Sequence, residues 1–369
     1  MLYPWCPLVT FAAFALGGCA TFPSDLVSSC ASYAPAIEYD QPHGTASTNI
    51  TVLTYNVEGL PWPARRDRSR QLREIGRQLS AMRAEGRAPD VVLLQEVFSA
   101  DAAAIAVHAG YPTRIQGPRR GVRRPPTSEG APQSLVQRRK LNKGEGLGPA
   151  LSSGLYVLSD FAVLRANAQP FRRRECAGFD CLANKGIQHV RLQVPGVPQP
   201  LDIFNTHLNA RRASKVSDAR SLEAHRLQIN EVSRFIEHKR DQRYPMIFGG
   251  DFNMRNAEGR FEHFSLRTPH PLVHQYCLKE AGACEVTLSW DGDTPWMDTQ
   301  DLQGFENGEV VHVRPIRVEA MFDTPWNGRP LADHDGLLVT YRLSWTASAQ
   351  LRSFTGSICK PQTLDRSGL

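Results

Sequence analysis

Seven polar residues stand at the edges of short apolar runs, and no other pattern in the sequence limits the fold so strongly. The run Met246–Phe248, for example, ends at two glycines and then presents Asp251 and Asn253. Burying a polar group without a partner costs on the order of a few kcal/mol. The full set is Asn56, Glu96, His207, Asp251, Asn253, Asp333 and His334. Because α/β proteins place their sites where strand ends converge, we expect these residues to meet in one site.

Each of these residues has a simpler explanation when it is taken alone. Asn56 could cap a turn, and Glu96 could pair with a neighbouring arginine. A lone histidine such as His207 is more often a hydrogen-bonded core residue than a catalytic one. It is the repetition at successive strand ends that favours a shared function.

The apolar runs alternate with helical patterns, which predicts an α/β fold with mixed strand connections. A run rich in β-branched residues at 49–57 predicts a strand, and the apolar face of 69–83 predicts an amphipathic helix. Further strands are predicted at 89–97, 153–165, 186–194, 201–208, 244–253, 309–322 and 335–343, and further helices at 99–109 and 214–239. Residues 112–150 are expected to form a long surface loop. No Pro/Gly linker divides the pattern, so we expect one core.

The charge balance favours an anionic partner. The formal net charge is +6 and the pI is about 8.9. A nucleic acid, a lipid headgroup or a phosphate ester would each satisfy this preference. Much of the excess lies between 114 and 143, where the basic residues are Arg114, Arg119, Arg120, Arg123, Arg124, Arg138, Arg139, Lys140 and Lys143, against the single acid Glu129.

The first nineteen residues have the form of an export signal. They contain an apolar stretch that is too short to span a bilayer and that ends in small residues. The sequence Leu16-Gly17-Gly18-Cys19 resembles the lipobox of bacterial lipoproteins, in which the cysteine is acylated, although no Lys or Arg precedes the apolar stretch. We therefore expect a periplasmic or outer-membrane-anchored lipoprotein, or alternatively a secreted protein. A buried first strand or helix is the alternative explanation.

The cysteines support export. Without Cys6 and Cys19, six remain, an even number that suits an oxidising compartment: Cys30, Cys176, Cys181, Cys277, Cys284 and Cys359. The pairs Cys176/Cys181 and Cys277/Cys284 could each close a loop, which leaves Cys30 and Cys359 to join the two ends, but the spacing does not prove this connectivity. A zinc site is a poorer explanation, because no spacing is Cys-x-x-Cys.

Five ordered motifs resemble those of the endonuclease/exonuclease/phosphatase superfamily, whose members include DNase I, inositol polyphosphate 5-phosphatases and neutral sphingomyelinases. The motifs are TYNVEGLPW, LLQEV, NTHLNA, GGDFN and ADHDGLLVTYRL. The resemblance implies a four-layer α/β sandwich, in which two packed mixed or antiparallel sheets are flanked by helices. It also implies a catalytic domain at 49–345, between an N-terminal lead at 20–48 and a C-terminal tail at 346–369.

The same resemblance implies a metal-dependent phosphoester hydrolase. Glu96 would be the principal ligand of Mg2+, or alternatively Mn2+, with Asn56 beside it. His334 matches the histidine that acts as a general base or contacts the phosphate, preceded by Asp333. Because adjacent side chains on a strand point to opposite faces, another buried aspartate is expected to orient His334, and the candidates are Asp301 and Asp298. That segment departs from the usual Asp-x-Ile pattern, since it carries Gln303.

Two further roles concern the attacking water and the phosphate. Asp251 resembles the residue that positions or deprotonates the water. Asn253 and His207 resemble donors to the nonbridging phosphate oxygens, where growing negative charge needs stabilisation.

The substrate is suggested by details of three segments. The Asn-Val-x-Gly-Leu-Pro form of the first motif, the segment GLYVLSDFAVL and the segment DCLANKG resemble the neutral sphingomyelinase branch. In that branch an Asp and a Lys with this spacing lie near the phosphate, so Lys185 is expected to contact the substrate and Asp180 to pair with Lys185 in the empty site. The structural alternative is that both residues only decorate a disulfide-closed loop.

Several other functions remain open at this point. A DNase I-like nuclease would use the basic segment 114–143 to bind phosphates, although the segment offers no aromatic residue after Tyr111 for base stacking. An inositol or sugar-phosphate phosphatase and a catalytically silent binding protein are the remaining candidates. The most favoured partner is a phospholipid, with a membrane contact through Cys19, and the chain is expected to be a monomer.

Overall fold

The computed structural model describes residues 22–62, 64–124, 133–279, 282–297, 299–347 and 358–359. The expected anchor Cys19 and the alternative aspartate Asp298 lie outside these residues. Among the residues that the model describes, no helix is long and apolar enough to cross a membrane.

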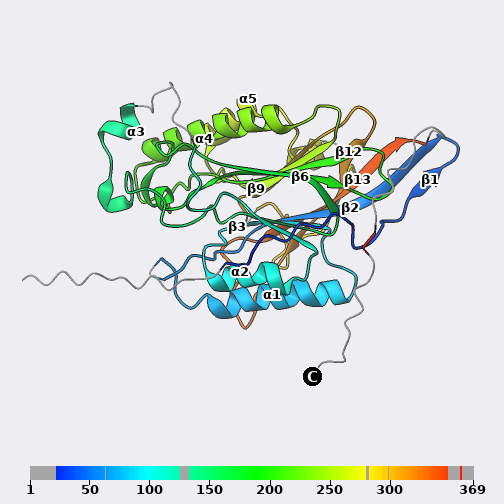
Figure 1. Cartoon of the computed structure of the whole chain (residues 1–369), viewed down its shortest axis with the longest axis horizontal. Helices are drawn as coiled ribbons and strands as arrows, with labels where there is room; N and C mark the ends of the chain where they lie inside the picture. The colour runs from blue at the N-terminus through cyan, green and yellow to red at the C-terminus, as the bar shows by residue number, and fades with distance from the viewer. Residues whose placement is uncertain are drawn as a thin grey trace, which may run out of the picture.

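Within the described residues, two β-sheets pack face to face and helices cover their outer faces (Figure 1). The first sheet has the order β10-β12-β13-β2-β3-β5-β4, with β1 paired to β2. Its strands are β1 Glu38–Asp40, β2 Thr45–Asn56, β3 Val91–Gln95, β4 Thr113–Gln116, β5 Tyr156–Ser159, β10 Glu285–Val286, β12 His312–Met321 and β13 Gly336–Thr346. The predicted four-layer α/β sandwich is confirmed.

The second sheet has the order β11-β9-β8-β7-β6. Its strands are β6 Ala162–Pro170, β7 Gly186–Gln193, β8 Leu201–His207, β9 Met246–Asp251 and β11 Asp301–Glu306. The helices of the described chain are α1 Ser69–Ala84, α2 Ala100–His108, α3 Gln133–Gln137, α4 Asp218–Lys239, α5 Glu258–Arg267 and α6 Val273–Lys279. In Figure 1, α1 and α2 lie together on one outer side and α4 and α5 on the other.

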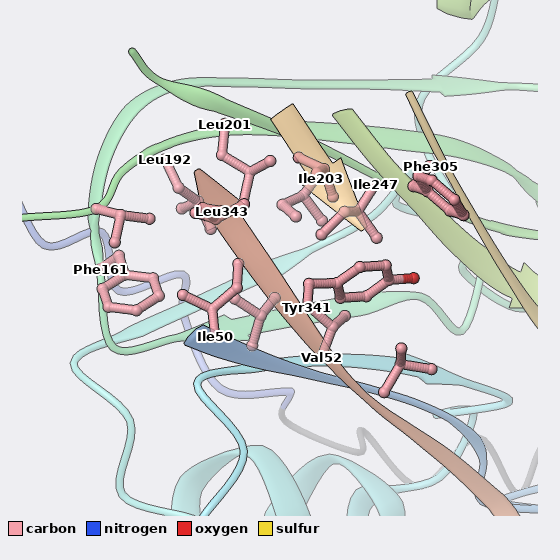
Figure 2. Packing of buried hydrophobic residues seen from close by; sticks show 14 of the residues in the cluster. Ile50, Val52, Phe161, Leu192, Leu201, Ile203, Ile247, Phe305, Tyr341 and Leu343 are labelled. Carbon is pink, nitrogen blue, oxygen red and sulfur yellow. The ribbon is translucent and has the colours of Figure 1, made fainter. Parts of the chain in front are cut away.

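A separate apolar core lies between each pair of adjacent layers of sheets and helices. Between the sheets, Ile50 and Val52 of β2 and Tyr341 of β13 meet Ile203 of β8 and Ile247 of β9 (Figure 2). A second cluster joins the first sheet to α1 and α2 through Leu72, Ile75 and Leu79, and a third joins the second sheet to α4 and α5 through Ile229, Val232 and Phe264. The alternation of apolar residues along β2 and β13 therefore serves both faces of one sheet.

Buried amides also connect the two sheets. The Gln303 side chain of β11 donates to the carbonyls of Val52 and Leu337, both at 2.9 Å. The Gln95 amide donates to Asn205 Oδ1 at 2.8 Å. Gln303, which departs from the expected family pattern, thus has a structural role, since it bonds one sheet to the other.

The strand pairing determines where the polar strand ends meet. β2 and β3 are parallel, as are β8 and β9, so each pair has its carboxyl ends on the same side. His207 is opposite Asp251 in the β8–β9 register, and antiparallel β11 places Asp301 opposite Asp251 on its other side. Three chain segments thereby converge at the end of β9.

Several predicted elements differ in extent from the observed ones. The expected loop 112–150 contains edge strand β4 and the short helix α3, and its residues 125–132 lie outside the described chain. The predicted strand at 153–165 is two strands, β5 and β6, which belong to different sheets and are separated by a turn at Asp160. The stretch from 254 to about 300, whose hydrophobic pattern is weak, contains α5 and α6, and β11 follows it; none of these elements was predicted.

Candidate active site

The centre of the candidate site is a buried pair of aspartates held by Asn56. The Asn56 side-chain amide donates to Asp251 Oδ2 at 3.0 Å, and its backbone N–H donates to Asp301 Oδ2 at 2.8 Å. Its own side-chain oxygen accepts the backbone N–H of Glu58 at 3.0 Å. Asn56 therefore links the end of β2 to the ends of β9 and β11, and it fixes both carboxylates.

Asp251 can serve as a proton acceptor near neutral pH. Its pKa is raised to about 6, mainly by burial; the charges of His334 and Lys185 oppose the rise, and the Asp301 carboxylate adds to it. A carboxylate with a pKa close to the working pH is suited to take a proton from water. This geometry is compatible with the role expected for Asp251.

Glu96 follows β3 on a left-handed backbone with φ of 57°, which turns the chain away from the strand direction. Its side chain is 18% exposed, and its Oε1 lies 4.0 Å from His207 Nε2. Burial raises the pKa of Glu96 to about 7, and Asp333 and Asp251 contribute, whereas Lys185 and His334 lower it. Carboxylates that lie this close together in a buried site resist ionisation. A bound cation would stabilise their ionised forms.

His207 and Lys185 form the positively charged side of the site. His207 Nε2 lies 2.9 Å from Lys185 Nζ and 3.3 Å from Asp251 Oδ2. Burial lowers the pKa of His207 well below its ordinary value, and the charges of Lys185 and His334 lower it further. His207 is therefore neutral near pH 7, and it offers a single ring N–H as a donor.

Lys185 also pairs with Asp180, as expected for an empty site. Its ammonium group donates to Asp180 Oδ1 and to the Leu208 carbonyl, the latter at 3.0 Å. Both side chains are buried, and the lysine contacts a histidine of the converging strand ends. The explanation that the two residues only decorate a disulfide-closed loop does not account for this contact.

His334 stands beside Asp301, one of its two candidate partners, while the other, Asp298, lies outside the described residues. Its Nδ1 lies 3.5 Å from Asp301 Oδ1. Burial opposes protonation of His334, but the carboxylates of Asp301, Asp251 and Asp333 together raise its pKa to about 10. The ring is therefore an imidazolium at neutral pH.

Asp333 turns away from its neighbour His334. Its side chain is half exposed and lies 3.4 Å from Arg65 Nη2. Its charge still reaches the site, because it contributes to the raised pKa values of Glu96 and His334. Asp333 thus acts on the site through the electrostatic field of its charge. It does not form a hydrogen bond with the His334 ring.

The backbone at the end of β9 is tightly constrained, and this constraint fixes the position of Asn253. Gly250 adopts φ of 145°, and a Cβ there would lie 2.0 Å from the Thr206 carbonyl oxygen. Phe252 is buried against Phe248 and Phe264, so the polar residues on either side of it face the site. The Asn253 amide donates to the Leu208 carbonyl at 3.2 Å, which also accepts from Lys185.

One group of residues in the described chain has the geometry of a metal site. Asp251, Asp301 and His334 each bring a potential ligand atom within 4.8 Å of the others. Asp301 Oδ1 and His334 Nδ1 are both buried, and neither makes a hydrogen bond. Together with Glu96, this set offers the hard oxygen donors that divalent cations such as Mg2+ prefer.

Sequence reasoning missed Arg260, which is buried behind the site. Its Nη1 donates to the carbonyls of Asn209 and Asn253 at 2.6 and 3.0 Å. Burial lowers its pKa to about 10, while the charges of Asp180 and Asp251 act in the opposite direction. The sequence did not indicate this role, because Arg260 is a single arginine in a stretch whose hydrophobic pattern is weak.

The fold and the converging carboxylates define a class of phosphoester-hydrolysing enzymes. Residues 53–306 match the model of the Endonuclease/Exonuclease/phosphatase family. The chain belongs to this family.

Known relatives point to one branch of the family. The chain is 28% identical over 220 residues to a sphingomyelinase of Mycobacterium tuberculosis, a match that spans 59% of this chain and 36% of the relative. The similarity thus covers about a third of that relative's length.

Solved structures share the fold at low identity. A magnesium-bound mutant of β toxin from Staphylococcus aureus has a TM-score of 0.55 at 14% identity, covering 79% of this chain and 99% of its own. TDP2 of D. rerio in complex with a single-strand DNA product has a TM-score of 0.52 at 16% identity, covering 79% of this chain and 98% of its own. These likenesses describe the fold.

Proposed function

We propose that this protein is a Mg2+-dependent phosphodiesterase that hydrolyses a sphingomyelin-like phospholipid. The observation that carries the proposal is the buried cluster in which Asp251 and Asp301 face His334, next to Glu96 and Lys185. So many ionisable groups in one buried place are costly to the fold, and they are typical of catalytic sites. The similarity to a sphingomyelinase supports the substrate class.

The residues present fit a divalent cation. Burial, with a further contribution from neighbouring carboxylates, raises the pKa values of Glu96 and Asp251, and Asp301 Oδ1 is a buried acceptor without a hydrogen bond. Glu96 would hold the cation, with Asn56, Asp251 or Asp301 beside it. A bound cation would supply positive charge to the scissile phosphate and lower the pKa of a coordinated water.

The remaining residues divide the tasks of hydrolysis. Asp251, fixed by Asn56, orients the attacking water and accepts its proton. Lys185 and His334 place positive charge beside the nonbridging phosphate oxygens, and His207 and Asn253 offer neutral donors. On phosphate binding, Lys185 would exchange its contact with Asp180 for one with the substrate.

A substrate panel tests this function. Purified protein is assayed with Mg2+, with Mn2+ and with chelator on sphingomyelin, glycerophospholipids, DNA and inositol phosphates. We expect hydrolysis of sphingomyelin that the chelator abolishes. Glu96→Ala and His334→Ala should each lower it by at least about 100-fold, whereas His43→Ala, which alters an exposed histidine, should not.

Other results of the panel would replace the substrate. Hydrolysis confined to DNA, weakened steeply by salt, would identify a nuclease. Hydrolysis of inositol phosphates alone would identify a phosphatase. If neither Glu96→Ala nor His334→Ala changes any activity, the catalytic role is wrong.

We also propose that the protein is exported and anchored through Cys19. Three disulfides support this proposal: Cys30–Cys359, Cys176–Cys181 and Cys277–Cys284. They agree with the pairing expected from the sequence, and disulfides persist in oxidising compartments. The mass of the non-reduced mature protein is the test, because a chain with six free thiols and no lipid would contradict the proposal.

A further inference from the structure

A basic cavity adjoins the catalytic cluster on the far side of Lys185. Its volume is about 480 Å³, and segments 122–124, 146–149, 170–176 and 180–185 line it, with Gln228 at one side. Asp251, Asp301 and His334 do not belong to its lining. Lys185 is shared, since it lines the cavity and its Nζ lies 2.9 Å from His207 Nε2. The cavity is thus distinct from the reacting centre, and Lys185 lies between the two.

The lining carries a clear excess of positive charge. Its cationic residues are Arg123, Arg124, Arg172, Arg173, Arg174 and Lys185, and its acids are Glu175 and Asp180. Behind the lining, buried Glu231 pairs with Arg124 and lies 3.3 Å from Arg172. Even with Glu231 included, cations outnumber carboxylates by six to three.

Two of these arginines form no ion pair with any acid of the described chain. Arg173 and Arg174 are exposed, and in the described part of the chain no ion pair joins either of them to a carboxylate. Arg173 makes only a 3.4 Å contact from its Nη2 to the Gly146 carbonyl. Burial lowers the pKa of Arg124, and the charge of Arg172 lowers it further, as expected where cations crowd together.

We propose that this cavity is a subsite for a second phosphate group, distinct from the scissile phosphate, on a phospholipid headgroup. Arginine forks bind phosphate oxygens in pairs, and these charge-assisted bonds are among the strongest polar contacts. The proposal rests on the proposed function and extends it, because this lining would hold a phosphate group beside the place where the phosphodiester is cleaved.

The shape and composition of the cavity favour a compact headgroup over a nucleic-acid strand. Its volume lies in the range of small-ligand pockets. Its only aromatic lining residue, Phe171, is buried and offers no face for base stacking.

The second phosphate could come from two sources. It could belong to the substrate molecule itself, attached to the headgroup beyond the scissile bond. It could instead belong to a neighbouring anionic lipid, bound while a different molecule is hydrolysed. Both sources present the same phosphate ester chemistry to Arg173 and Arg174.

A binding experiment tests the subsite without relying on activity. Inorganic phosphate is titrated calorimetrically into full-length protein in chelator. The variant is Arg173→Gln with Arg174→Gln, and the control is Arg70→Gln with Arg314→Gln, which removes the same charge from exposed positions elsewhere. We expect the cavity variant to weaken phosphate binding at least about tenfold, and the control less than about twofold.

Equal affinities in the two variants would overturn the subsite. Both variants should unfold at the wild-type temperature, because neither pair of arginines forms an ion pair with a buried acid. If phosphate binds as expected but no phosphoester is hydrolysed, the subsite stands and the proposed function fails.

Vesicle assays with Mg2+ then distinguish the sources. If the cavity variant alone loses the preference for phosphatidylinositol 4-phosphate over phosphatidylinositol, the substrate supplies the second phosphate. If it alone loses stimulation of sphingomyelin hydrolysis by phosphatidic acid, a neighbouring lipid supplies it. If its only selective loss is in cleavage of a single-stranded oligonucleotide, the cavity serves nucleic acid and the headgroup proposal is wrong.

Discussion

At the residue scale, the charge state of His334 depends on its carboxylate neighbours. Burial alone would keep the ring neutral, but the carboxylates of Asp301, Asp251 and Asp333 together outweigh burial. Because the folded-state pKa is raised, this group stabilises the fold fully below its ordinary pKa. That stabilisation is lost as the pH rises through about 10 in the cation-free protein.

We predict that Asp301→Asn lowers the pKa of His334. The amide keeps the shape of the carboxylate but removes the charge that lies 3.5 Å from Nδ1. In chelator, the wild-type ring should stay protonated through pH 8, whereas the variant ring should titrate at lower pH, as followed by NMR of the imidazole carbons. Asp333→Asn is the control and should produce a smaller shift, because that side chain is half exposed. A wild-type ring that titrates near pH 6.5 would contradict the role given to Asp301.

We also predict that Lys185→Gln lowers both the activity and the stability of the protein. The substitution removes the ammonium that lies between Asp180 and His207, and with it one positive charge at the phosphate. The rate constant kcat should fall by about 10- to 100-fold, and unfolding should become easier by about 1–3 kcal/mol, since Asp180 loses its buried partner. Lys279→Gln on α6 is the exposed control. A normal kcat in the Lys185 variant would assign the residue a structural role only.

At the element scale, the close approach of β8 and β9 depends on Gly250. A side chain there would meet the Thr206 carbonyl at 2.0 Å, and the backbone adopts φ of 145°. We predict that Gly250→Ala destabilises the protein by about 3 kcal/mol or more in urea unfolding, because backbone atoms must move apart.

Gly44→Ala is the matched control for that prediction. Gly44 also has a positive φ, of 60°, but a Cβ there meets nothing within 4 Å. Its cost should stay near 1 kcal/mol, the strain of a left-handed alanine. Similar losses in the two variants would show that backbone conformation, and not the approach to Thr206, sets the requirement for glycine.

The sequence predicted those elements whose hydrophobic pattern is strong. The strands that end at Asn56, His207 and Asp251, and the strand just before Glu96, are buried on both faces or alternate clearly, and so their polar ends stood out. β11 was missed because it is a short strand with a glycine and Gln303 in its interior. These residues form a strand through their pairing with β9. Because the paired residues of β9 and β11 are fifty or more positions apart in the sequence, no local sequence pattern indicates that they pair.

The same limit applies to side-chain direction. Adjacent placement of Asp333 and His334 in the sequence predicted opposite orientations, and the structure agrees. Their partners, Arg65 and Asp301, come from distant segments, and only the packed sheets bring them near. The basic cavity is a further example, because its arginines come from separate loops that carry no common motif.

At the scale of the whole molecule, two connections hold the sandwich together. Buried amides such as Gln303 bond the two sheets across the central core. The Cys30–Cys359 disulfide joins residues 329 positions apart, and the Ala31–Ile358 bridge pairs the backbone beside it. All thirteen strands of the described chain lie between these two cysteines in the sequence.

We predict that the long-range disulfide contributes more stability than the short-range one. In the chain-entropy model a cross-link stabilises by restricting the unfolded chain, and the effect grows with the loop that it closes. Replacing Cys30 and Cys359 by serine should therefore cost about 5 kcal/mol, against about 2 kcal/mol for the Cys277/Cys284 pair, whose separation is 7 residues. Urea unfolding of the two double variants provides the comparison, and the paired substitution leaves no free thiol from the broken bridge. Equal losses would mean that the unfolded chain is already compact enough to keep its ends close, and that the link acts only on the folded state.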